Sequence, residues 1–184
     1  FTMRRGAVGR RIFMHRLSGM ESVDHKRGLV TFFAGSTTLE CVRTLRKTFR
    51  VKHEADGKEY PATFWSHPTL SHISIGSWFG CSNHGNTGPM GKPSSHAVAD
   101  KGLQIWNMAE DDPMSRRDFL SYEEARKLFD RPEYARKHLI VTVTFARANL
   151  APDFMVQKKL TVVRDEASAN EWLFKSRANL RVLF

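Results

Sequence analysis

The sequence predicts a mixed α+β fold, and three observations carry this prediction. Apolar, β-branched segments alternate irregularly with amphipathic helical ones, in the order strand, strand, helix, loop, strand, helix, strand. The 184 residues are 41% hydrophobic and include 13 phenylalanines, which suffices for one globular core or for one domain and part of another. The glycine patterns of doubly wound dinucleotide folds and of phosphate loops do not occur in the sequence.

The first part of the chain is predicted to form strands. Residues 11–17 are consistent with a short strand, and residues 20–24 and 28–34 are predicted to pair through a turn at 25–28. The second of these segments, Leu-Val-Thr-Phe-Phe-Ala, is rich in β-branched and aromatic residues and ends before Gly35.

A helix is predicted over residues 36–47. Thr37 is the expected N-cap, with Glu40 three residues later as the acid of a capping box. Three apolar residues are expected to share the buried face: Leu39, Val42 and Leu45. Cys41 is expected to be a small buried hydrophobe.

The remaining segments are assigned by the same criteria. A second helix is expected from an N-cap at Ser121 to about Asp130, ending before Pro132. Residues 54–60 are expected to be exposed, and residues 110–117 form a charged turn. Further strands are predicted at 103–108, 138–145 and 156–164, and a further helix at 168–174.

Small residues are concentrated in segment 73–88, which begins as an apolar run and is expected to continue as a loop. Gly76, Gly80, Gly85 and Gly88 surround the single histidine His84. Because few Cβ atoms stand in the way, backbone N–H groups of such a loop can approach a ligand closely and form anion-binding hollows. The segment therefore indicates a cofactor whose phosphates lie along the backbone.

Several blocks of sequence, in this order, resemble the FAD-binding (PCMH-type) domain of the vanillyl-alcohol oxidase / p-cresol methylhydroxylase family. Residues 29–46 resemble its strand-turn-helix pattern, and Ser74-Ile-Gly-Ser resembles its Thr-Ile-Gly-Gly. Cys81-Ser-Asn-His-Gly-Asn resembles the Thr-Gly-Thr-His-Gly-Ser of the sugar-lactone and alditol oxidase branch. Residues 122–129 and 138–145 resemble the helix and strand that close the domain.

The resemblance implies a fold and a division of the chain. In that family FAD lies extended between two α+β subdomains, and this chain corresponds to the second subdomain. Residues 1–148 would then be an FAD-binding domain without its N-terminal part, and residues 149–184 the start of a substrate or cap domain.

The resemblance also implies a set of FAD-binding residues. Gly76 and the loop at 81–85 would line the path of the flavin, and a pair in the strand at 138–145 would offer main-chain hydrogen bonds to the cofactor. The set is Gly76, Ser77, Cys81, Ser82, Asn83, His84, Gly85, Asn86, Ile140 and Val141. His84 is expected to contact the flavin, although loop bonding and proton transfer are alternatives. The catalytic base would lie in the cap domain, so no catalytic residue is assigned.

The function implied is that of an FAD-dependent oxidoreductase. Its substrate would be a sugar lactone, an alditol or a related alcohol, oxidised at a hydroxyl-bearing carbon by hydride transfer to the flavin. The alternative is a non-catalytic relative that serves as a structural or interaction subunit and binds protein partners in a larger assembly. Two departures from the family pattern favour this alternative: Ser77-Trp-Phe in place of small residues, and a glycine-free segment at 131–138.

The charge and composition of the chain limit the kinds of molecule that it is expected to bind. The net charge of +10 attracts anions, but the basic residues are dispersed and no aromatics interleave with them, which disfavours nucleic-acid binding. No apolar run is long enough for a membrane span. His67, His72, His84 and His96 lack the spacing of a known metal site, so no metal is expected.

The sequence leaves the compartment open. Two cysteines are too few for a disulfide scaffold, which favours a reducing intracellular compartment. The basic start of the chain is also consistent with a mitochondrial transit peptide, although an internal basic strand and turn explains it as well.

Overall fold

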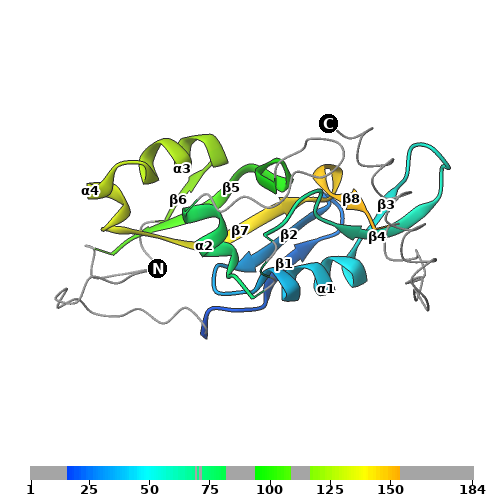
Figure 1. Ribbon diagram of the computed structural model, residues 1–184, viewed down its shortest axis with the longest axis horizontal. Helices are drawn as coiled ribbons and strands as arrows, with labels where there is room; N and C mark the ends of the chain where they lie inside the picture. Colours follow the sequence, from blue (N-terminus) through cyan, green and yellow to red (C-terminus); the bar gives the residue numbers. More distant parts are fainter. Residues whose placement is uncertain (1–15, 69, 71, 82–93, 109–116, 154–184) are drawn as a thin grey trace, which may run out of the picture.

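Two antiparallel sheets form the framework of the computed structural model, which describes residues 16–68, 70, 72–81, 94–108 and 117–153 (Figure 1). The larger sheet has five strands in the order β1-β2-β7-β5-β6, and the smaller has three in the order β3-β4-β8. The β3–β4 hairpin lies at one end of the molecule, and helices α3 and α4 lie at the other (Figure 1). The prediction of a mixed α+β fold is confirmed.

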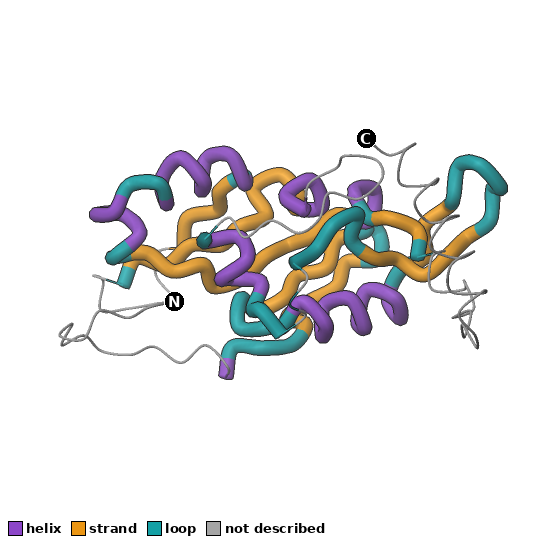
Figure 2. Tube along the Cα trace, viewed as in Figure 1, coloured by secondary structure: helices purple, strands orange, loops and turns teal. Residues whose placement is uncertain are grey.

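The five-stranded sheet is built around two long central strands (Figure 2). Its strands, in spatial order, are β1 (Met20–Asp24), β2 (Leu29–Phe33), β7 (His138–Ala146), β5 (Val98–Asn107) and β6 (Arg117–Leu120). The first two form the predicted hairpin, and β2 then pairs with β7, more than a hundred residues later.

The smaller sheet was not predicted from the sequence. It consists of β3 (Arg50–Lys52), β4 (Glu59–Thr63) and β8 (Ala151–Pro152). Of residues 54–60, which were expected to be exposed, residues 54–59 are exposed, whereas Tyr60 is half-buried. Because β8 pairs with β4, the chain beyond residue 148 packs against the rest of the fold as far as Asp153. The N–H of Asp153 donates to the carbonyl of Pro61. The proposed boundary near residue 148 stays a prediction.

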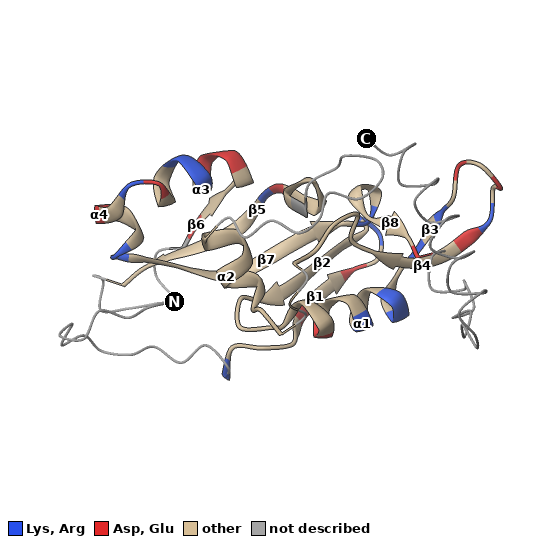
Figure 3. Cartoon of the chain, in the orientation of Figure 1, with Lys and Arg blue, Asp and Glu red and all other residues tan. Residues whose placement is uncertain are grey.

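The helices begin with the chemistry expected of them. The described residues include α1 (Thr38–Thr48), α2 (Ile75–Gly80), α3 (Tyr122–Phe129) and α4 (Pro132–Ala135), together with the 3-10 turns η2 (Ser94–Ala97) and η3 (Arg147–Asn149). Thr37 and Ser121 form capping boxes with Glu40 and Glu124, which confirms both predicted N-caps. Acidic residues at the start of α3 and basic ones toward its end can be followed in Figure 3.

The buried face of α1 differs from the prediction. Val42 and Leu45 are buried, but Leu39 is 39% exposed, and Thr38 and Cys41 complete the face instead. Thr38 is held on this face because it donates both its N–H and its hydroxyl to the carbonyl of Ile73. Cys41 is a small buried residue, as expected, and burial raises the pKa of its thiol.

The two faces of the five-stranded sheet differ in composition. Residues directly opposite on neighbouring strands share a face, and successive residues alternate. The pairs Val30–Phe145 and Phe32–Val143 are buried and pack with the helices in one core. We call this the core face. The pair Thr31–Thr144 lies between them and belongs to the opposite face of the sheet, which we call the outer face.

Several predicted segments lie outside the described residues. These are most of the strand at 11–17, most of the charged turn at 110–117, the strand at 156–164 and the helix at 168–174.

Candidate functional site

Three distant segments meet where β2 ends and both α1 and α2 begin. The N–H of Ala34 donates to the carbonyl of Val141 at 2.8 Å, and the N–H of Gly76 donates to the carbonyl of Ala34 at 2.8 Å. The N–H of Ile75 donates to the carbonyl of Ser36 at 2.9 Å. We call this backbone-bonded region, residues 34–38, 73–76 and 141, the junction.

Gly76 has a packing role in the junction. A Cβ atom at this position would lie 2.9 Å from both the Cβ and the carbonyl oxygen of Ala34. Only glycine therefore lets the first turn of α2 lie directly against the end of β2. Because Gly76 has no side chain, its backbone can contact the backbone of Ala34 directly.

The expected loop character of residues 75–80 is wrong, because these residues form α2. Ser74 caps the helix by accepting a hydrogen bond from the N–H of Ser77 at 3.3 Å. The signal for this helix is in the sequence: Ile75, Trp78 and Phe79 follow the i, i+3, i+4 spacing of an apolar face, and all three are buried. Two glycines obscured this pattern.

The aromatic residues of α2 point into the core. The ring of Trp78 lies 5.2 Å from that of Phe64, edge to face, and Phe79 lies 5.9 Å from Tyr122. Trp78 is 1% exposed and Phe79 4%. These two bulky residues, which depart from the family pattern, therefore fill the space between α2 and the sheet.

Cys81 is exposed immediately after α2, where its N–H donates to the carbonyl of Ser77 at 3.0 Å. Of the predicted FAD-binding residues, those from Ser82 to Asn86, His84 among them, lie outside the described residues. Gly76, Ser77 and Cys81 thus share one short helix and its end. The described part of the chain brings this group to the base of the predicted cofactor loop.

The pair predicted to offer main-chain hydrogen bonds to the cofactor is buried. Ile140 is 4% exposed and Val141 6%, both within β7. The carbonyl of Val141 accepts the N–H of Ala34 in the junction, and Ile140 would lie 3.7 Å from a Cβ at Gly80. The structure therefore brings this pair beside α2, with one main-chain oxygen already bonded within the protein.

A separate cluster of titratable side chains lies in the β3–β4 hairpin. The hydroxyl of Tyr60 donates to Asp56 Oδ2 at 2.6 Å, and His53 Nδ1 lies 3.0 Å from Asp56 Oδ1. The hydrogen bonds from Tyr60 and from the N–H of Lys58 lower the pKa of Asp56 to about 2. The same carboxylate raises the pKa of Tyr60. These contacts stabilise the turn of an exposed hairpin and line no described cavity.

The histidines considered as metal ligands do not gather within the described part of the chain. No group of three or more His, Cys, Asp or Glu side chains suited to a metal ion occurs among the residues described. His84 lies outside them.

Comparisons with known proteins leave the family open. No family model matches the chain, and a search of curated proteins finds no match. Within the described residues, every helix is too short or too polar to cross a bilayer.

Proposed function

We propose that this chain is the second-subdomain part of an FAD-dependent oxidoreductase that acts on a hydroxyl-bearing carbon of a sugar lactone, an alditol or a related alcohol. The observation that carries the proposal is the junction. The sequence blocks that resemble the family, residues 29–46, 74–86 and 138–145, are far apart in the chain, yet backbone hydrogen bonds link all three there.

The described residues are compatible with a cofactor at this position. Trp78 and Phe79 are buried in the core, so their bulk does not occupy the surface at the end of α2. Cys81, where the segment resembling the cofactor loop begins, is exposed. When bound, FAD supplies the redox chemistry by accepting a hydride from the substrate carbon. The role of the described residues would be to hold α2, from Ile75 to Gly80, against the sheet through the junction.

The first test is the absorbance spectrum of the purified full-length protein, before and after incubation with FAD. A flavin spectrum that stays with the protein through gel filtration supports the proposal. A folded, colourless protein that cannot be reconstituted overturns it and favours the alternative, a non-catalytic subunit with protein partners.

A pair of variants tests whether FAD binds beside the end of α2. Cys81→Phe places a large side chain at the exposed end of α2, and we expect FAD affinity to fall at least about tenfold, or about 1.4 kcal/mol. Ala135→Phe, at an exposed position on α4, is the matched control and should leave the affinity unchanged. Equal affinities for both variants would mean that FAD binds elsewhere.

A further inference from the structure

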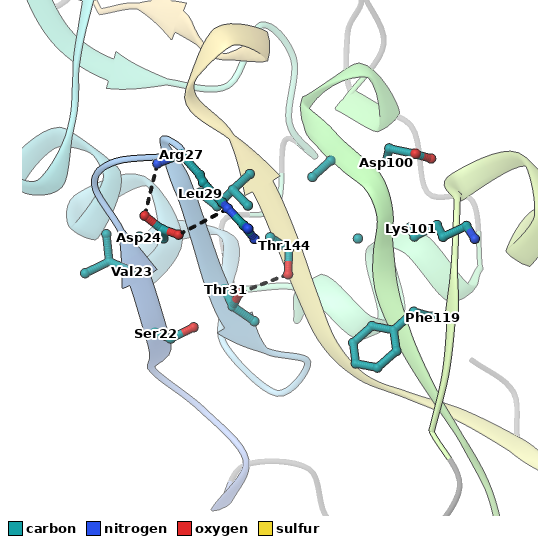
Figure 4. Close-up of a pocket in the computed structure, with 12 residues that line it drawn as sticks. Ser22, Val23, Asp24, Arg27, Leu29, Thr31, Asp100, Lys101, Phe119 and Thr144 are labelled. Carbon is teal, nitrogen blue, oxygen red and sulfur yellow. Dashed lines mark hydrogen bonds and ion pairs between the residues drawn. The ribbon is translucent and has the colours of Figure 1, made fainter.

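A groove lies on the outer face of the five-stranded sheet, opposite the face on which the helices pack (Figure 4). Its volume is about 420 Å³, within the usual range of small-molecule sites. Strands β1, β2, β7, β5 and β6 all contribute to it. Its charged side chains are Asp24, Arg27, Asp100 and Lys101, two of each sign. Its other side chains used below are Ser22, Thr31, Thr144 and Phe119.

The floor of the groove is made of hydroxyl groups. Thr31 and Thr144 are directly opposite on β2 and β7, and their hydroxyl oxygens lie 2.9 Å apart. Ser22 is opposite Thr31 on β1. A hydroxyl both donates and accepts, so the bonded threonine pair retains acceptor capacity toward a ligand. This floor suits a ligand that itself carries several hydroxyl groups.

An irregularity in β5 forms one side of the groove. Val98 is opposite Phe145 and Leu103 is opposite Val143, so residues 99–102 bulge out beside Thr144. Lys101 has a φ of 49°, in the left-handed region that non-glycine residues seldom adopt. A Cβ at Gly102 would lie 2.7 Å from the carbonyl oxygens of Ala99 and Thr144. Bulges and strained residues of this kind are over-represented at binding sites.

The walls carry a cation on one side and an aromatic ring on the other. Arg27 reaches across β2 toward Thr144, and Phe119 lies on the opposite side of the groove (Figure 4). The carboxylate of Asp24 accepts the N–H of Arg27 at 3.0 Å and lies 3.9 Å from its Nε. This contact is made through Nε, and the Arg27 side chain is largely exposed, so its outer nitrogens can meet a ligand. Phe119 is 57% exposed, although it is a large apolar residue.

We propose that this groove binds an anionic carbohydrate, a single sugar ring or short polyol that bears a carboxylate or a phosphate. The sugar hydroxyls would bond to Thr31 and Thr144, the apolar C–H face would pack on Phe119, and the anionic group would meet Arg27. The site is independent of the proposed flavin function, because α2 and the junction pack with the core face.

The test is calorimetric titration of the full chain with four probes: glucose 6-phosphate, glucuronate, glucose and inorganic phosphate. The anionic group is a phosphate in glucose 6-phosphate and a carboxylate in glucuronate. Binding of either at least about tenfold more tightly than both glucose and phosphate supports the proposal. Phosphate binding as tightly as the sugars would mean a simple anion patch, and no binding of either anionic sugar would mean no site. Both results overturn the proposal.

Matched variants locate the site. Arg27→Gln should weaken binding of the anionic sugar about tenfold, whereas Arg126→Gln, which removes an arginine paired with Asp130 on α3, should not. Phe119→Ala should weaken it by a similar factor, and Leu39→Ala, an exposed apolar residue on α1, is its control. All four positions are at least partly exposed, so the variants should fold. Unchanged affinity in both Arg27→Gln and Phe119→Ala would overturn the assignment.

Discussion

Helices α1 and α2 begin side by side at the junction, yet they are specified in different ways. Thr37 and Ser74, their N-caps, form an antiparallel bridge. Helix α1 has 11 residues, a capping box, an acid in its first turn and bases in its last. Helix α2 has six residues, a single serine cap and no charged residue at either end.

The difference shows where each helix obtains its stability. Isolated helices shorter than about 12–15 residues are marginal in water, so both helices need support. Helix α1 has local support from capping and from favourable interactions of its terminal charges with the helix dipole. For α2 the support is burial: Ile75, Trp78 and Phe79 are at most 4% exposed. The comparison predicts that α2 depends on tertiary contacts more than α1 does.

The largest expected effect is on Trp78. Trp78→Ala should lower the free energy of unfolding by about 3–5 kcal/mol, because it leaves a cavity next to Phe64 and Phe79. Urea denaturation followed by circular dichroism measures it. Leu39→Ala, on the exposed face of α1, should cost less than about 0.5 kcal/mol. If the two variants lost a similar free energy of unfolding, α2 would not depend on burial more than α1 does.

The two glycines of α2 should respond in opposite directions. Gly76→Ala should destabilise by about 1–3 kcal/mol, because the added methyl meets Ala34 at 2.9 Å. Gly80→Ala, where the added methyl would contact Ile140 at an ordinary 3.7 Å, should be neutral or stabilising by up to about 1 kcal/mol. Thermal unfolding of both proteins provides the comparison. If Gly76→Ala proved the more stable variant, the close packing at the junction would be wrong.

Substitutions at the two N-caps test how much local hydrogen bonds contribute to the stability of each helix. Thr37→Ala and Ser74→Ala should each cost about 1 kcal/mol, since each removes the acceptor for an N–H in the first turn. Thr37→Ala also removes the hydrogen bond that the Thr37 hydroxyl donates to the Glu40 carboxylate, so its cost should be the larger. Denaturant titration of the two variants and the parent gives the order. A larger cost for Ser74 would indicate that the cap of α2 matters through the junction rather than through the helix.

The smallest effect concerns the β3–β4 hairpin, which, like α1, has local contacts within one segment. The pKa of Asp56 is lowered from 3.8 to about 2 in the folded chain. A lowered carboxyl pKa means that its stabilising contribution is present above pH 3.8 and is lost as the pH falls toward 2. NMR titration of hairpin amide shifts should follow this transition in the parent.

Tyr60→Phe is the matched variant for the hairpin. Removing the hydroxyl that donates to Asp56 should move the transition to higher pH, toward 3.8. A transition at the same pH in both proteins would show that Tyr60 does not set the pKa of Asp56.

Much of the fold follows from local sequence. The hairpin of β1 and β2, the capped starts of α1 and α3, and strand β7 were predicted, because each has a periodicity or a capping pattern within a single segment. Strands β3 and β4 were missed because they are short and polar, and β8 was missed because its two residues form a strand only when residue 151 returns to pair with residue 63. Helix α2 was missed because its glycines resemble those of a loop.

The candidate site shows the same division. The role of Gly76 in binding FAD stays a prediction, and the structure adds a packing role, because a Cβ at this position would meet Ala34. The groove was not predicted at all. Its threonines are 113 residues apart, and nothing in either segment indicates that their hydroxyls meet. The one local signal was the turn-forming pair Lys101-Gly102 within a strand.

By itself the sequence determined the α+β class, the local caps and the blocks that suggest a flavin domain. Those properties depend on residues within a few turns or on a short pattern, where local hydrogen bonds and side-chain periodicity act. The tertiary structure decided that residues 75–80 are a helix, that Thr31 meets Thr144 and that three distant segments share the junction. These depend on strand register and on burial, which are set only when segments far apart in the chain pack together.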